Sequence, residues 1–181
     1  MDKQLLEELS EQLKKGDDSA ITPIYQMTNK VIFSIALSIL KDEHLAQDIM
    51  QDTYLKMRSS IDSYQSGTNF LAWLSQIARN FALMEYRKRK KEVLVDVTSN
   101  EYLMGSVSYD FKEQNPILSA ALTILTKEER EVVFLHINND LKHREISKVI
   151  NKPLGTVLWI YNKAIKKLKD YFEKNGGVSN E

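Results

Sequence analysis

Apolar residues recur along most of the chain at the three- and four-residue spacing that places them on one side of a helix. The first such stretch is 3–15, and the second is 20–40. In the second stretch apolar residues cover more than half of the circumference, which predicts a helix buried on several sides. Two further helices are predicted over 43–62 and 70–90, with a polar loop at 63–68 between them.

The helical pattern is lost over residues 92–114. This stretch is net acidic, and residues 93–97 within it could form a short strand, although no partner strand is evident. Its length and the change of composition on both sides predict a linker between two domains. We therefore expect domains at 1–91 and 115–175, followed by a short tail at 176–181.

The helical pattern returns in the second half of the chain. Helices are predicted at 116–125, 127–138, 142–150 and 154–173. Thr126 and Glu129 have the spacing of a capping box, and Asn151 tolerates the left-handed conformation that a tight turn before Pro153 needs. Two helices joined by a turn of three or four residues form a helix-turn-helix motif. The expected fold class is all-α, with two small helical domains joined by a linker and a helix-turn-helix in the C-terminal domain.

The composition agrees with a helical protein. The 181 residues include only 6 Gly and 3 Pro, which are too few turn residues for a β-rich fold. The absence of Cys excludes a disulfide scaffold and thiolate metal sites. No stretch resembles an export signal or a membrane span, since the strongest apolar run is short and lies at 31–40. We therefore expect a cytoplasmic protein without membrane insertion.

The formal net charge of zero hides a sorting of charge along the chain. Residues 1–74 carry a net charge of −4 and residues 75–91 carry +5. Residues 92–125 carry −4 and residues 126–181 carry +3. Two basic segments separated by an acidic one suggest two contacts with a polyanion. Solvated helix faces are the alternative, and the five consecutive basic residues at 87–91 favour the polyanion.

No arrangement of residues typical of a catalytic site is evident. The three histidines, at positions 44, 136 and 143, lack metal-type spacing, and the chain has no Gly-rich phosphate loop, HExxH or GxSxG motif. Asp48 and Asp52 lie four residues apart and could form a carboxylate pair for a metal, but an exposed acidic helix face is the simpler explanation. We expect no enzyme activity, no cofactor and no metal, and we expect His136 and His143 to be ordinary surface or boundary residues.

The helix-turn-helix segment favours DNA as the polyanion. Gly155 and Thr156 open the second helix of the motif, whose free N–H groups can approach a phosphate. Basic side chains follow at Lys163, Lys166, Lys167 and Lys169. Helical hairpins that do not bind DNA share this pattern, but the two basic segments favour DNA binding.

Three motifs in order give the chain a resemblance to bacterial sigma factors of the extracytoplasmic-function type. Residues 46–54, AQDIMQDTY, are similar to the family's A-E-D-[LI]-x-Q-[ED]-x-[FY]. Residues 73–80, WLSQIARN, are similar to W-L-x-x-I-A-R-N. In the second half, EIS at 145–147 and GTV at 155–157 match E-I-A and G-T-V at the family's spacing. The resemblance covers about 20–91 and 116–172.

The resemblance implies a protein that binds core RNA polymerase, recognises promoter DNA and starts transcription, and it allows an anti-sigma factor as a further partner. Polymerase would dock at Asp48, Gln51, Asp52 and Tyr54. The loop 63–68, the helix after it and the basic run would hold the melted −10 strand and the neighbouring duplex, while the last helix would read the −35 element. The residues so assigned to DNA are Tyr64, Asn69, Arg79, Asn80, Arg87, Lys88, Arg89, Lys90, Lys148, Thr156, Trp159, Asn162, Lys163 and Lys166.

The recognition helix departs from the family pattern G-T-V-K-S-R-L-x-R-A, because Leu158, Trp159 and Ile160 replace its polar and basic residues. The helical period predicts a buried stripe at Val157, Tyr161, Ala164 and Leu168, with Trp159 and Ile160 turning away from it. We predict that Trp159 is exposed and contacts another macromolecule, with promoter DNA favoured over protein.

Two other functions remain open from the sequence. One is a sigma-like accessory regulator that binds polymerase or DNA but cannot initiate alone. The other is a helix-turn-helix repressor with a helical effector or dimerisation domain. The acidic face around Asp48 argues against the repressor, because a repressor has no need of a polymerase-docking surface.

Overall fold

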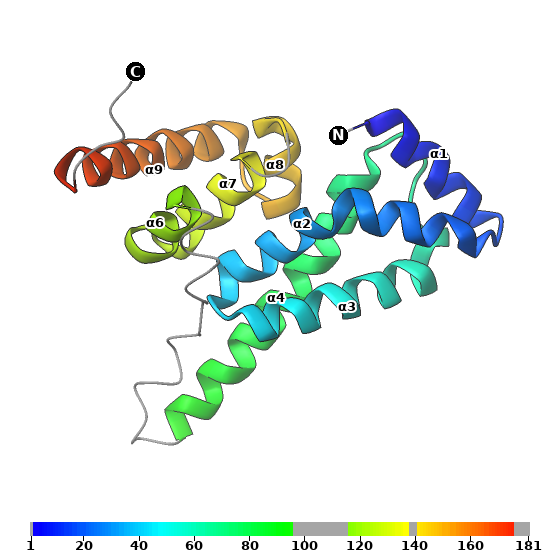
Figure 1. Cartoon of the computed structure of the whole chain (residues 1–181), viewed down its shortest axis with the longest axis horizontal. Coiled ribbons are helices and arrows are strands. Elements are labelled where there is room, and N and C mark those ends of the chain that lie inside the picture. The colour runs from blue at the N-terminus through cyan, green and yellow to red at the C-terminus, as the bar shows by residue number, and fades with distance from the viewer. Residues whose placement is uncertain (1, 96–115, 138–140, 176–181) are drawn as a thin grey trace.

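The computed structural model describes residues 2–95, 116–137 and 141–175, and all the regular structure in these ranges is helical (Figure 1). The all-α fold class is confirmed. In the first half the helices are α1 Lys3–Lys14, α2 Ile21–Leu40, α3 Glu43–Ser60 and α4 Phe70–Val95, with short 3₁₀ turns at Asp18–Ala20 and Ile61–Ser63. In the second half they are α6 Pro116–Ile124, α7 Lys127–Ile137, α8 His143–Ile150 and α9 Leu154–Lys174.

The end of α4 corrects one expectation from the sequence. Residues 93–95 extend α4, so the short strand considered at 93–97 does not form there. The remainder of the expected linker and the tail at 176–181 lie outside the described residues.

Local side-chain chemistry starts and stops the helices where the sequence suggested. Asp42 begins α3 by accepting a hydrogen bond from the Leu45 backbone N–H at 3.1 Å. Thr126 and Glu129 form the expected capping box: the Thr126 N–H donates to the Glu129 carboxylate at 2.9 Å, and the Glu129 N–H donates to Thr126 Oγ1 at 3.4 Å. Asn151 ends α8 in the left-handed conformation, with φ 52°.

Helix α2 lies at the centre of the first half and packs against both α3 and α4. It buries residues around most of its circumference, as its apolar pattern predicted. One polar contact in this core joins two helices: the Thr28 hydroxyl on α2 and the Tyr54 hydroxyl on α3 are 2.7 Å apart. Thr28 is fully buried, and Tyr54 is only 8% exposed.

The two halves of the chain pack against each other, which no sequence pattern had indicated. Helix α7 lies along α2, and α8 lies against α4 (Figure 1). The Arg130 side chain on α7 is buried in this contact, where its Nε donates to the Ser38 carbonyl of α2 at 2.8 Å and its Nη1 donates to the Leu125 carbonyl at 2.7 Å. Beside it, Arg79 on α4 pairs with the buried Glu131 on α7 at 2.9 Å.

The Tyr54 hydroxyl gives a direct test of this core. Burial raises the pKa of Tyr54, so the hydroxyl stays protonated and can share its hydrogen bond with Thr28 at neutral pH. Tyr54→Phe should lower the free energy of unfolding by about 1 kcal/mol, because it leaves the buried Thr28 hydroxyl with a poorer set of partners. Urea denaturation followed by circular dichroism measures this loss.

The matched control is Tyr25→Phe, since Tyr25 packs on the Tyr54 ring but is 40% exposed. This change should leave the free energy of unfolding nearly unaltered. Equal losses in the two variants would show that the Thr28–Tyr54 hydrogen bond contributes nothing of its own.

Candidate functional site

The helix-turn-helix consists of α8, the turn at 151–153 and α9. Helix α9 buries one stripe against the second-half core, at Val157, Ile160, Ala164 and Leu168. Tyr161 is only partly buried. The expectation that Ile160 turns away from the buried stripe is therefore wrong: Ile160 is 3% exposed and is part of the core. The stripe differs from the prediction at one position, where Ile160 is buried and Tyr161 is only partly so, because the core extends around the helix on the side of Ile160.

Trp159 is exposed, as the sequence predicted. Its side chain is 62% exposed, and the neighbouring Leu158 and Leu154 are 39% and 36% exposed. The Lys163 ammonium lies 4.8 Å from the centroid of the Trp159 ring, a cation–π distance. We call Leu154, Leu158 and Trp159 the apolar tip of α9. Such a cluster is unusual at the surface of a small domain and is typical of an interaction site.

Polar residues surround the apolar tip on the same helix and on α8. Asn162, Lys163, Lys166 and Lys148 are exposed, and Thr156 is partly exposed. The helix-turn-helix therefore presents an apolar tip within a basic surface. Helix N-termini attract anions, so the first turn of α9 also suits a nucleic-acid backbone.

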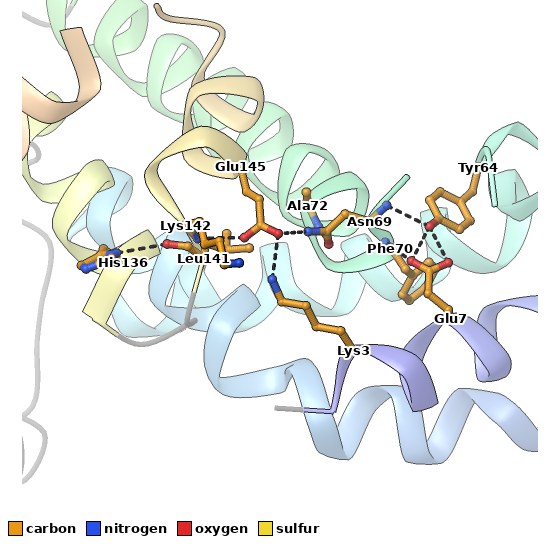
Figure 2. A network of polar contacts seen from close by, with 10 residues as sticks. All are labelled: Lys3, Glu7, Tyr64, Asn69, Phe70, Ala72, His136, Leu141, Lys142 and Glu145. Atoms are coloured by element: carbon orange, nitrogen blue, oxygen red, sulfur yellow. Dashed lines mark hydrogen bonds and ion pairs between the residues drawn. The ribbon is translucent and has the colours of Figure 1, made fainter. Parts of the chain in front are cut away.

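A pair of histidines lies behind this surface. The rings of His136 on α7 and His143 on α8 stack with centroids 4.4 Å apart, and Tyr161 on α9 packs edge-on against both. His136 Nδ1 lies 3.0 Å from the Leu141 carbonyl (Figure 2). Burial lowers the pKa of His143, and the neighbouring His136 lowers it further. The two histidines join three helices of the second half and are packed more closely than the sequence suggested.

The second patch of interest lies on α3. Asp48, Gln51 and Asp52 are all exposed on one side of this helix. Leu55, one turn further along the same side, is 71% exposed, more than the other large apolar residues among those described. Tyr54 does not belong to this surface, because its side chain is in the core. Leu55 was missed from the sequence, although it is an apolar residue outside the buried stripe of α3.

The loop before α4 is held by a carboxylate from α1. The Tyr64 hydroxyl donates to both oxygens of Glu7, at 2.6 and 2.7 Å, and the Phe70 N–H donates to Glu7 Oε1 at 2.9 Å (Figure 2). Tyr64 is 1% exposed, and burial together with the Glu7 hydrogen bond raises its pKa to about 12. Tyr64 therefore anchors the loop from inside and offers no free ring to a ligand.

Asn69 joins α4 to the second half of the chain. Its Oδ1 accepts from the Ala72 N–H at 3.0 Å, which caps α4, and its Nδ2 donates to Glu145 Oε1 on α8 at 2.6 Å. The same Glu145 oxygen accepts from the Lys3 ammonium at 2.7 Å (Figure 2). Its other oxygen accepts from the Lys142 N–H at 2.8 Å, which caps α8. Glu145 thus joins α1, α4 and α8.

The remaining candidate residues lie along α4. Arg79 is largely covered by its ion pair with Glu131. Asn80, Arg87, Lys88 and Lys90 are exposed. Arg89 lies 3.8 Å from Asp42 and is 25% exposed. The structure therefore leaves the distal, basic end of α4 open and turns Asn69 and Arg79 toward α8 and α7.

The part of the chain that the structure describes offers neither a membrane span nor a metal site. None of the helices in residues 2–95, 116–137 and 141–175 combines the length and apolar character that a membrane span requires. In the same ranges no three side chains of His, Asp or Glu gather closely enough to hold a metal ion.

The chain is similar to known sigma factors along most of its length. Residues 24–92 match the family model for Sigma-70 region 2. The chain is 31% identical over 169 residues to the ECF RNA polymerase sigma factor SigM of Bacillus subtilis strain 168, covering 89% of this chain and 99% of SigM. It is 30% identical over 143 residues to the ECF RNA polymerase sigma factor EcfG of Rhodopseudomonas palustris strain TIE-1, covering 75% of each chain.

Solved structures share the fold. The structure of CnrH in complex with the cytosolic domain of CnrY superposes with a TM-score of 0.69 at 20% identity, over 94% of this chain and 98% of that one. The sigma factor RpoE from Bartonella quintana, in complex with the anti-sigma factor NepR, superposes with a TM-score of 0.68 at 23% identity, over 87% of this chain and 99% of that one.

The histidine pair predicts how the stability of the second half depends on pH. Because the pKa of His143 is lowered from 6.5 in the folded chain, the unfolded chain binds this proton more readily. The stabilisation is therefore complete above about pH 6.5 and is lost as the pH falls toward the lower folded pKa. The free energy of unfolding, measured from pH 7.5 to 5.5, should fall in the wild type and fall less steeply in His143→Gln.

His44→Gln is the control for this measurement, because His44 is exposed on α3 in the other half. Its pH profile should follow the wild type. A wild-type slope retained in His143→Gln would assign the pH dependence to other groups.

Proposed function

The chain belongs to the extracytoplasmic-function family of RNA polymerase sigma factors, and from this premise we propose how its surfaces divide the work of initiation. As a sigma factor it binds core RNA polymerase and directs it to specific promoters. In the proposal, residues 1–91 dock on polymerase and hold the −10 element. Residues 92–114 are the linker, and residues 115–175 read the −35 element.

The observation that carries this proposal is that the chain exposes two surfaces that its own core does not use. One is the acidic patch with Leu55 on α3, and the other is the apolar tip with its lysines on α9. They lie in different halves of the chain and differ in charge, which suits two different partners. A run-off transcription assay with purified core polymerase tests the whole proposal. Initiation on promoter templates supports it, whereas binding without initiation would favour an accessory regulator.

The α3 patch suits a partner surface that is basic and partly apolar. An exposed leucine beside two carboxylates offers apolar area next to charge, and protein interfaces combine the two. Asp48, Gln51 and Asp52 supply the polar part of the patch, and Leu55, one turn further along, supplies the apolar part. We assign this patch to core polymerase. Tyr54 supports the patch from the core and does not contact polymerase in this arrangement.

Removing the two carboxylates should weaken polymerase binding without unfolding the chain. Asp48→Ala with Asp52→Ala removes two charged groups, each of which contributes about 1–3 kcal/mol if its hydrogen bond is buried. A titration of core polymerase with labelled protein should therefore show an affinity at least tenfold lower, with an unchanged helical spectrum.

Asp62→Ala with Asp170→Ala removes two exposed acids at other places and controls for net charge. This control pair should bind polymerase as the wild type does. If both pairs weaken binding equally, long-range charge and not the α3 patch explains the effect.

The exposed residues that we assign to DNA form two groups, one on α4 and one on the helix-turn-helix. Asn80, Arg87, Lys88 and Lys90 are open on α4 and suit the phosphates beside the −10 element. On the helix-turn-helix, the lysines and Thr156 suit phosphates, and Asn162 and Trp159 suit the base edges of the major groove. Apolar side chains contact the methyl group of thymine, so the tip favours a thymine-containing −35 element.

Asn69 and Arg79 enter the proposal only with a change in arrangement. Both side chains are engaged by carboxylates of the second half, Glu145 and Glu131 respectively. Their contact with DNA requires α7 and α8 to separate from α4. Tyr64 is held in the core by Glu7, and we assign it to positioning the loop 63–68.

An anti-sigma protein is proposed as the regulator of this chain. The support is the fold shared with CnrH and RpoE, whose structures contain CnrY and the anti-sigma factor NepR. We call the arrangement in which α7 lies against α2 and α8 lies against α4 the closed packing. It would then be one of the states on which such a regulator acts.

Trp159 should determine promoter discrimination more than overall affinity. A base pair that is read correctly contributes about 1–3 kcal/mol to the difference between specific and non-specific binding. Trp159→Ala should therefore lower the ratio of affinities for a −35 duplex and a scrambled duplex about tenfold, measured by fluorescence anisotropy at fixed salt. The non-specific affinity should change little.

Lys166→Ala provides the contrast, because an exposed lysine bound to phosphate should weaken both duplexes alike. The unfolding transition of Trp159→Ala should match the wild type, since the side chain is 62% exposed. An unchanged affinity ratio would remove Trp159 from the DNA interface.

A further inference from the structure

A cavity of about 320 Å³ lies where the two halves of the chain meet. Lys41, at the C-terminal end of α2, and Arg89 on α4 contribute to it from the first half. Lys127 and Arg130, in the first turn of α7, contribute from the second half. The Tyr86 ring forms part of the wall, with the Lys127 ammonium 4.2 Å from its centroid. Four cationic groups from three helices thus line one cavity.

Among residues 2–95, 116–137 and 141–175, these four charges are poorly neutralised. The hydrogen bonds of Arg130 go to backbone carbonyls of Ser38 and Leu125, which carry no net charge. Arg89 lies 3.8 Å from Asp42, a long contact with a carboxylate that also caps α3. Glu131 attracts both Lys127 and Arg130, but its short ion pair is with Arg79.

The pKa values of the two lysines are lowered, as expected for cations held together in a partly buried place. Burial lowers the pKa of Lys41, and the charge of Arg130 lowers it further. Burial also lowers the pKa of Lys127, where Arg79, Arg87 and Arg130 act in the same direction and Glu131 acts against them. An anion in the cavity would reverse this repulsion and stabilise all four charged forms.

The size and chemistry of the cavity define a ligand class. Its volume is at the lower end of the range of small-molecule sites, about 300–1,000 Å³. Guanidinium and ammonium groups together suit phosphate oxygens, because arginine binds them in a fork and lysine as a point charge. The Tyr86 ring, with Ile39 and Leu40, supplies an apolar part of the cavity wall, which a less polar group beside the anion can contact.

We propose that this cavity binds a phosphate-bearing anion and that the bound anion holds the two halves of the sigma factor together. The site takes Lys41 and Arg89 from one half and Lys127 and Arg130 from the other, so it is complete only while α7 lies against α2 and its side chains reach α4. A free small anion would stabilise this closed packing. A phosphate of the DNA backbone offers the same chemistry from a different source, in a complex formed before the two halves separate to release Asn69 and Arg79. The site does not depend on the assignment of the α3 patch or the apolar tip.

The first probe is inorganic pyrophosphate, titrated into the full-length chain by calorimetry at low salt and followed by thermal unfolding. The site variant is Arg89→Gln with Lys127→Gln, which removes one cation from each half and leaves the buried Arg130 in place. The control is Lys30→Gln with Lys174→Gln, which removes the same charge from one exposed position in each half that the proposed function does not assign to DNA. We expect saturable binding with one site per chain, weakened at least tenfold in the site variant and much less in the control.

The second probe is a duplex without promoter sequence, whose affinity is measured over a range of salt. If pyrophosphate does not bind the wild type, but the site variant lowers the salt slope by about two and the control leaves it unchanged, the anion is a backbone phosphate and the cavity assignment stands. Equal weakening of pyrophosphate binding in the site variant and the control would show a diffuse charge effect and overturn the proposal. The proposal also fails if neither probe distinguishes the site variant from the control.

Lys41→Gln is a second, independent variant, because Lys41 reaches the cavity from α2. It should weaken pyrophosphate binding in the same direction as the site variant. This result would confirm that the cavity, and not the basic run of α4 alone, holds the anion, and normal binding in Lys41→Gln would contradict the site as drawn.

Discussion

The buried guanidinium of Arg130 sets the arrangement of the whole chain. A charge in a protein interior is strongly unfavourable unless its donors are satisfied. Arg130 is 6% exposed and donates to the carbonyls of Ser38 and Leu125, so α7 can lie against α2 only where these carbonyls are in reach. The next residue, Glu131, then meets Arg79 on α4. The position of α8, and with it the contact between Glu145 and Asn69, follows from that of α7.

The same contact places carboxylates where the proposed function needs phosphates. Asn69 and Arg79 are polar side chains assigned to promoter DNA, and Glu145 and Glu131 occupy them in the closed arrangement. A carboxylate and a phosphate make comparable charge-assisted hydrogen bonds to such donors. Opening the two halves on DNA is then an exchange of one set of anions for another and not a plain loss of bonds. The exchange costs less than breaking buried ion pairs outright.

The sequence predicted the helices well because their signals are local. Apolar periodicity, the Thr126–Glu129 capping box and the left-handed Asn151 are read from neighbouring residues, and the structure shows them as expected. The facing of single residues was less predictable. Tyr54 lies in a family motif and Tyr64 in the loop assigned to the −10 strand, yet their hydroxyls bond to Thr28 and Glu7 in the interior.

The packing between halves could not be predicted from the same signals. Arg130 and Ser38 are far apart in the sequence, and no periodicity records their contact. The burial of a single residue on a helix was also hard to predict, as the exposed Leu55 on α3 and the buried Ile160 on α9 show. A helical wheel gives angles around the axis, but the width of the buried arc depends on which other helices lie alongside, and that is decided by tertiary packing.

Under the proposed function, the side chains of helix α9 separate affinity for DNA from specificity for its sequence. Lysine charges attract any phosphate backbone, so their contribution falls with salt and is the same on every sequence. The apolar tip adds nothing to that attraction, but an aromatic ring beside a thymine methyl distinguishes one base from another at any salt. Lys163 links the lysines to the apolar tip, because its ammonium lies over the Trp159 ring. The same ammonium is 3.8 Å from Glu129. Under the proposed function, the departure of this helix from its family pattern is an exchange of polar base contacts for apolar ones, with the phosphate contacts retained.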